Sequence, residues 1–185
     1  MATYGYTGPF NGGTGAYDEQ AWFQQALTIP TTMSVSSLSY YGSQYACSVY
    51  GRIWNSSGTK IYEGAANTDS GFTAWRTSTF SPSNKPLLVA GNTYYFGVYV
   101  GTSLLGLTLS KYETGGVSGG KAGSYSATNT ITPPGAFEWQ LGFYLTYEEV
   151  TGPADVNTIN GVSAGNIGSI DTIDYVDIAK INTVS

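Results

Sequence analysis

The stretch "FEWQLGFYLTYEEV", residues 137–150, alternates large apolar side chains with polar or small ones. The odd-numbered positions hold the large apolar residues, Phe137, Trp139, Leu141, Phe143, Leu145 and Tyr147. The even-numbered positions, which form the other parity, hold Glu138, Gln140, Gly142, Tyr144, Thr146 and Glu148. Side chains of a β-strand point alternately to opposite faces, so a period of two over about a dozen residues predicts a strand. One face of this strand should lie in a core and the other should meet solvent.

The same alternation recurs earlier in the chain. In "YACSVYGRIW", residues 45–54, the core parity is Tyr45, Cys47, Val49 and Ile53, and in "TYYFGVYVG", residues 93–101, it is Tyr94, Phe96, Val98 and Val100. Strands are expected near 22–29, 33–41, 44–55, 59–63, 72–80, 93–101, 104–110 and 136–149, with turn-forming clusters between them. The predicted fold class is all-β, an antiparallel two-sheet sandwich, and the expected topology is a jelly roll.

One segment also has the features of a helix. The acidic residues of "DEQAWFQQAL", residues 18–27, suit a helix N-terminus, and a strand over 22–29 is the alternative. The expected domain organisation is an extended N-terminal arm over 1–16, the sandwich over 17–150, a linker over 151–155 and a separate tail over 156–185.

Composition supports a β protein and argues against several partners. The chain of 185 residues holds 16 Tyr and 25 Gly, and only 10% of its residues are charged, against about 25% in typical globular proteins. The net charge is −5 and no cluster of Lys or Arg occurs, so binding to nucleic acid or to an anionic membrane surface is not expected. No apolar stretch approaches the roughly 20 residues of a membrane span, so membrane insertion is not expected either. The N-terminus has neither the basic nor the apolar region of a signal peptide.

The tail carries an eleven-residue repeat. Its β-branched residues fall on one lattice, namely Val156, Ile159, Val162, Ile167, Ile170, Ile173, Ile178, Ile181 and Val184. The Gly, Asn, Asp and Thr between them favour turns over a helix, which indicates an extended ribbon punctuated by turns. A lone ribbon cannot bury this lattice. We therefore expect it to serve oligomerisation or anchoring, with packing on its own sandwich or a terminus without fixed structure as alternatives.

Two segments resemble proteins of tailed phages. The tail "INGVSAGNIGSIDTIDYVDIAKINTV", residues 159–184, resembles an "INGV…ANI.KINGV" pattern that ends many of their structural proteins, although Thr172 and Thr183 stand where that pattern has Gly. The segments "GRIWNSSGTKIYEG", residues 51–64, and "LLVAGNTYYFGVYV", residues 87–100, resemble a jelly-roll pattern of phage fibre, decoration and surface-adhesion proteins. In that pattern, "W-(N/D)-x-x-G-T" marks a hairpin and "AGxxYYxGVY" a core strand.

The resemblance implies a virion structural protein without catalytic activity, of the capsid decoration or fibre type. Such a protein would be made in the host cytoplasm and displayed on the virion surface. Its partners would be copies of itself, with a homotrimer favoured, and capsid or tail proteins of the same particle. A glycan-binding adhesin or receptor-binding head that contacts host surface glycans is the alternative, and a jelly-roll glycoside hydrolase is a remote one.

Few residues suggest catalysis. Histidine is absent, which excludes Ser-His-Asp and Cys-His sites, and Cys47 is expected to be a buried inert thiol. Glu138 is the best candidate for a glycosidase carboxylate, but Glu63, Glu113 and Glu148 do not supply a recognisable second one, and a solvated strand residue is the simpler interpretation. No cofactor and no metal are expected, since the tail aspartates 171, 174 and 177 lack the spacing of a calcium loop.

Aromatic residues on the non-core parities are candidates for glycan contact, because sugar rings stack on exposed aromatic rings. The candidates are Trp54, Trp75 and Tyr144, and Tyr50, Tyr95 and Tyr99 share such parities. Ordinary packing in a core or a subunit interface is the alternative for each of them.

Overall fold

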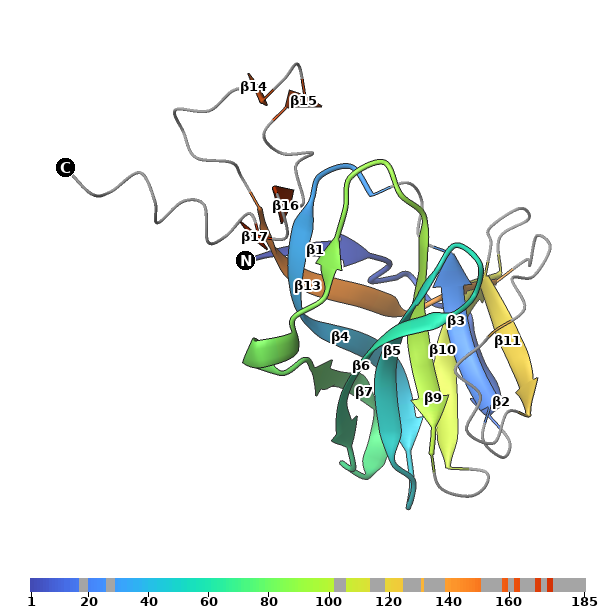
Figure 1. The fold of residues 1–185 in the computed structure, drawn as a ribbon. Coiled ribbons are helices and arrows are strands. Elements are labelled where there is room, and N and C mark those ends of the chain that lie inside the picture. Colours follow the sequence, from blue (N-terminus) through green and yellow to red (C-terminus); the bar gives the residue numbers. More distant parts are fainter. Residues whose placement is uncertain are drawn as a thin grey trace.

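The protein is built from two antiparallel β-sheets that pack face to face (Figure 1). The computed structural model describes residues 1–16, 20–25, 29–101, 106–113, 119–124, 131 and 139–150, together with four two-residue strands in the tail. The predicted all-β class and the two antiparallel sheets are confirmed. The jelly-roll topology stays a prediction. None of the described residues forms a helix that is long and apolar enough to cross a membrane.

The larger sheet has eight strands centred on β4 (Met33–Gln44). Its main path runs β1 (Ala2–Gly5), β13 (Phe143–Glu149), β4, β10 (Leu107–Glu113) and β12 (Trp139–Leu141). In addition, β2 (Gly12–Ala16) pairs with β10, whereas β7 (Gly71–Thr79) and β8 (Leu87–Leu88) pair with β4. The short 3-10 helix η1 (Pro82–Asn84) connects β7 to β8.

The smaller sheet has five strands in the order β11 (Gly119–Ser124), β3 (Gln20–Gln25), β9 (Tyr94–Val100), β5 (Val49–Asn55) and β6 (Lys60–Asn67). Its hairpin between β5 and β6 falls on "WNSSGT". There the side chain of Asn55 accepts hydrogen bonds from the backbone N–H groups of Ser57 and Thr59, and Gly58 adopts a φ of +84° that favours glycine. The local turn chemistry therefore explains why this motif forms a hairpin.

The core lies between the two sheets and follows the predicted alternation. Leu141, Phe143, Leu145 and Tyr147 are buried, as their parity predicts. The expected single strand over 136–149 is divided at Gly142, whose N–H donates to Ser110 and whose carbonyl accepts from Tyr41. The chain changes partners at this residue, since β12 pairs with β10 and β13 pairs with β4.

Three local predictions were wrong or only partly right. The expected N-terminal arm supplies β1 and β2 of the large sheet, because Tyr4 packs against the core and the glycines allow close backbone approach. The helix alternative fails at Gln20–Gln25, where pairing of β3 with both β9 and β11 overrides local propensity. Tyr45 is 48% exposed rather than in the core, because β4 ends at Gln44 and Tyr45 begins the turn to β5.

Candidate aromatic binding face

The outer face of the large sheet carries a group of aromatic side chains. Strand register places Tyr41 of β4 opposite Trp75 of β7, and Tyr144 of β13 opposite Ser39 of β4. These side chains have the parity opposite to the buried Tyr40 and Leu145, so they project away from the core. The three rings therefore come from three neighbouring strands and share one side of the sheet.

The rings contact one another closely. The centroid of Trp75 lies 4.8 Å from that of Tyr144 and 5.1 Å from that of Tyr41. Phe10 stacks on Tyr41 at 4.8 Å with an interplanar angle of 15°, and Tyr6 meets Phe10 edge-on at 5.6 Å. We call Tyr6, Phe10, Tyr41, Trp75 and Tyr144 the aromatic face. Trp75 is 36% exposed and the other four are half-buried, so the face is packed within itself and still open to solvent.

The N-terminal segment brings two of these rings onto the sheet. After β1, the N–H of Tyr6 donates to the carbonyl of Phe143, and the N–H of Asn11 donates to the carbonyl of Lys111. The Tyr6 hydroxyl donates to the carbonyl of Pro9 within the loop between these anchors. Phe10 occupies the space over Gly142, where an added Cβ would lie 2.9 Å from two of its ring carbons.

Hydroxyl groups line the sheet beside the aromatic face. One register row crosses four strands as Thr3, Thr146, Ser37 and Thr79, and the next row includes Ser39 and Thr77. Ser39 Oγ and Thr77 Oγ1 are hydrogen-bonded at 2.9 Å. Thr3, Thr77 and Thr79 are exposed, Thr146 is half-buried, and Ser37 and Ser39 are buried beneath them. We call these six residues the hydroxyl rows; none of them carries a charge.

The structure brings together two of the three residues that were predicted to contact glycans. Trp75 and Tyr144 are neighbours in the aromatic face. Trp54 is a wrong prediction, because its side chain is fully buried on the other sheet. Its cross-strand neighbour Tyr95 is buried as well, and Ile131 closes over the adjoining turn by donating its N–H to the carbonyl of Gly58. Parity alone does not show whether an outward-facing side chain is exposed or buried.

The sequence prediction missed Tyr6, Phe10 and Tyr41. For Tyr41, the burial of Leu38 and Tyr40 on the opposite parity is a local signal only. Met33 and Val35 are buried on the same odd parity as Tyr41, because the register of β4 against β13 shifts between Val35 and Ser37. Tyr6 and Phe10 carry no such signal, because they lie in a loop whose path depends on pairing more than a hundred residues away, at Phe143.

A charged cluster lies on the outer face of the small sheet. Glu63 Oε2 accepts from Arg52 Nε at 2.6 Å and from Lys60 Nζ at 3.1 Å, and the Arg52 guanidinium lies 3.7 Å above the ring of Tyr99. Burial by itself would raise the pKa of Glu63, but Arg52 and Lys60 outweigh it and hold this pKa below its ordinary value. Glu63 is therefore an ionised partner of two cations, which does not suit a general acid.

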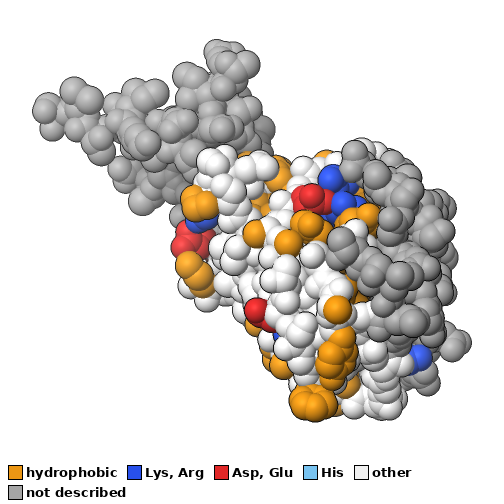
Figure 2. Space-filling model, turned by 90° about the horizontal axis from the view of Figure 1, so that it is seen from below, with side chains coloured by type: hydrophobic (Ala, Val, Ile, Leu, Met, Phe, Trp, Pro, Cys, Tyr) orange, Lys and Arg blue, Asp and Glu red, His pale blue; other side chains and the backbone are white. Residues whose placement is uncertain are grey.

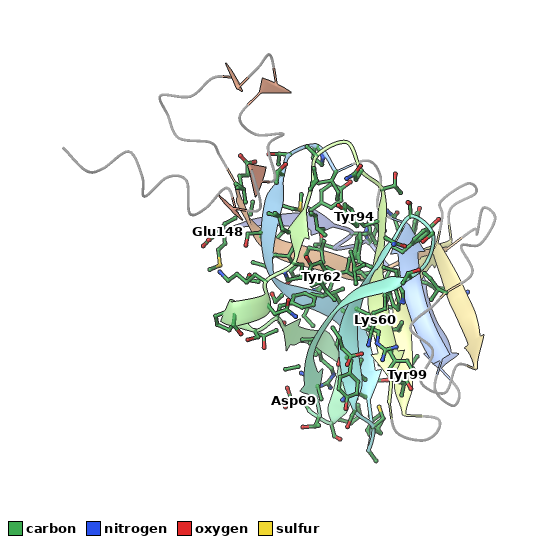
Figure 3. The ribbon with its side chains drawn as sticks, viewed as in Figure 1. Lys60, Tyr62, Asp69, Tyr94, Tyr99 and Glu148 are labelled. Atoms are coloured by element: carbon green, nitrogen blue, oxygen red, sulfur yellow. The ribbon has the colours of Figure 1, made fainter. Side chains whose placement is uncertain are left out.

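The other candidate acids do not join this cluster. Lys60 and Tyr99 lie on the small sheet, whereas Glu148 lies at the far end of β13 (Figure 3). Glu138 lies outside the described residues, and the side chain of Glu113 is not among those described. Among the described residues, no group of three or more His, Cys, Asp and Glu side chains is placed to hold a metal ion.

Cys47 is buried, as predicted, and burial raises the pKa of its thiol. It belongs to a polar network at one end of the sandwich. The Tyr40 hydroxyl donates to Gln44 Oε1, and Gln44 Nε2 donates to the carbonyls of Cys47 and Asn67 at 2.9 and 2.8 Å. This network joins the turn after β4 to the end of β6. Its side chains have structural partners, so we assign it a structural role.

Four residues of the predicted tail lattice lie in described strands. β14 (Thr158–Ile159) pairs with β15 (Val162–Ser163), which sets Ile159 opposite Val162. β16 (Ser169–Ile170) pairs with β17 (Ile173–Asp174), which sets Ile170 opposite Ile173. The second hairpin repeats the register of the first, eleven residues later. The remaining lattice residues Val156, Ile167, Ile178, Ile181 and Val184 lie outside the described part, as do Asp171 and Asp177.

Comparison with known proteins adds no relative to this description. Protein-family models, curated proteins and solved structures were searched, and none matches the chain.

Proposed function

We propose that this protein is a non-catalytic structural component of a virus particle, of the capsid decoration or fibre type. The sandwich is the displayed unit and residues 156–185 assemble or anchor it. Its partners are copies of itself, with a homotrimer favoured, and capsid or tail proteins of the particle. In this role the protein is made in the host cytoplasm and displayed on the virion surface.

The pair of tail hairpins with the same register is the observation that carries this proposal. Each hairpin has only two residues per strand, and even a longer two-stranded hairpin is marginally stable alone in water. The β-branched pairs Ile159–Val162 and Ile170–Ile173 recur at the repeat distance, so one contact surface is presented twice. A repeated apolar surface on units too small to be stable alone is well suited to packing against other copies of the same tail.

We expect the double substitution Ile159→Asp with Ile170→Asp to abolish the oligomer. It puts a charged side chain at an apolar contact position of each hairpin, and burying that charge between copies would be unfavourable. The matched control is Thr158→Asp with Ser169→Asp, which adds the same charge to the same strands at the neighbouring positions. Light scattering of the purified full chain should give a monomer mass for the isoleucine variant and the oligomer mass for the control. A monomeric wild-type chain, or equal masses for both variants, would contradict the proposal.

A receptor-binding head is the second candidate function. The exposed aromatic face favours it, because half-exposed tyrosine and tryptophan are typical of recognition surfaces. The two functions are compatible, since a displayed particle component can also contact a host.

A further inference from the structure

We infer that the aromatic face and the hydroxyl rows form one binding site for a neutral saccharide. This inference rests on the second candidate function, the receptor-binding head, and names the ligand class. It does not require that the tail assembles the protein.

The two halves of the site match the two kinds of surface on a sugar. A pyranose ring presents an apolar C–H face and a rim of hydroxyl groups. The rings of Trp75 and Tyr144 offer an apolar surface that is open to solvent, and the exposed Thr77 and Thr79 offer hydroxyls that both donate and accept hydrogen bonds. On β7, Trp75, Thr77 and Thr79 occupy alternate positions, so the two hydroxyls lie next to the tryptophan ring on the same face of the strand. A single ligand can therefore meet both surfaces.

The charge of the site selects among ligands. The aromatic face and the hydroxyl rows contain no Lys, Arg, Asp or Glu, so their own side chains supply no cation for a phosphate, sulfate or carboxylate. The small sheet differs in this respect, because Arg52, Lys60 and Glu63 form a charged cluster on its outer face. On the face shown in Figure 2, most of the described surface is uncharged, and the Lys, Arg, Asp and Glu atoms gather in a few small groups. A neutral polyhydroxylated ligand fits this surface better than an anionic one.

The rings are held in place before any ligand arrives. Trp75 is in contact with Phe10, Tyr41 and Tyr144, with centroid distances of 4.8–6.2 Å. Phe10 is seated on Gly142, and its loop is anchored to β13 and β10 by backbone hydrogen bonds. Binding then immobilises few side chains, and a preorganised site loses less entropy.

The test is a glycan array probed with the full chain, followed by calorimetry on the strongest ligand. We expect binding to neutral saccharides, and Trp75→Ala and Tyr144→Ala should each weaken it by about tenfold or more, which corresponds to about 1.4 kcal/mol. Thr79→Val keeps the side-chain shape but removes the hydroxyl, and it should cause a smaller loss.

Phe72→Ala is the matched control. Phe72 lies near the start of the same strand β7 and is 87% exposed. A register shift between β4 and β7 separates it from Trp75, and it is not a member of the aromatic face. This variant should bind as the wild type does. The inference is overturned if no saccharide binds, if only charged saccharides bind, or if Phe72→Ala weakens binding as much as Trp75→Ala. It is also overturned if Trp75→Ala dissociates the oligomer, which would make the face a subunit interface.

Light scattering of the same samples measures assembly separately. A chain that assembles but binds no saccharide defeats the inference and leaves the structural function standing. A monomeric chain that binds saccharide defeats the assembly proposal and leaves the inference standing.

Discussion

At the scale of single residues, Gly142 joins two features of the protein. It lies where the chain changes from β12 to β13, and its missing side chain makes room for Phe10. The alternation of "FEWQLGFYLTYEEV" predicted the core side of this segment correctly, with Leu141, Phe143 and Leu145 buried. It did not predict the division at Gly142, because the backbone partners Ser110 and Tyr41 are distant in sequence.

Gly142→Ala should destabilise the fold by roughly 1–3 kcal/mol, the usual cost of overpacking. Its Cβ would lie 2.9 Å from the Phe10 ring and from Tyr41 Cβ, so Phe10 must move. Gly12→Ala is the control, since its Cβ would meet Lys111 at an ordinary 3.5 Å. Urea denaturation should give a lower midpoint for Gly142→Ala only. Equal midpoints for wild type and Gly142→Ala would show that Phe10 is not seated as described.

Glu63 makes a second prediction at this scale. Its pKa in the folded protein lies below the ordinary value of 4.5, so its ionised form is favoured by folding. The resulting stability is present above about pH 4.5 and is lost as the pH falls through the lowered folded-state pKa. Glu63→Gln should therefore be less stable than wild type at pH 7, and the difference should shrink in acid.

Urea denaturation at several pH values measures this effect. Glu148→Gln, which removes an exposed carboxylate from β13, is the control and should change stability little at pH 7. A constant difference between wild type and Glu63→Gln from pH 7 to well below pH 4.5 would contradict the ion-pair account.

At the scale of strands, the sequence predicts strand positions that follow from alternation and hairpins that follow from local turn residues. The segments 33–41, 44–55, 72–80 and 93–101 overlap β4, β5, β7 and β9, and the "WNSSGT" hairpin forms as expected. Features set by distant pairing were missed. The Gly- and Thr-rich residues 1–16 have no alternation, yet β1 and β2 pair with β13 and β10.

Burial on both faces of the small sheet was also missed. Phe96 and Val98 face the core as predicted, but Tyr95 and Tyr99 on the other side of β9 are buried too. Period two distinguishes the two faces of a strand and does not tell whether a further layer covers the outer one. The same limit explains why Trp75 and Tyr144 face outward and are at least partly exposed, whereas Trp54, on the outer parity of β5, is fully buried.

At the scale of the whole molecule, the sandwich and the tail have different sources of stability. The sandwich buries a continuous core that includes Leu38, Val49, Phe96 and Leu145 from both sheets. The tail has aromatic character only at Tyr175, and its described hairpins are two residues per strand. We therefore expect the sandwich to fold without the tail, and the tail to depend on other copies or on a partner.

The most direct test of the proposed assembly is the molar mass, by light scattering, of the full chain and of a chain that lacks residues 154–185. We expect an oligomer, with a trimer favoured, for the full chain, and a folded monomer with a cooperative unfolding transition for the shortened one. An unchanged oligomer after removal of the tail would contradict it.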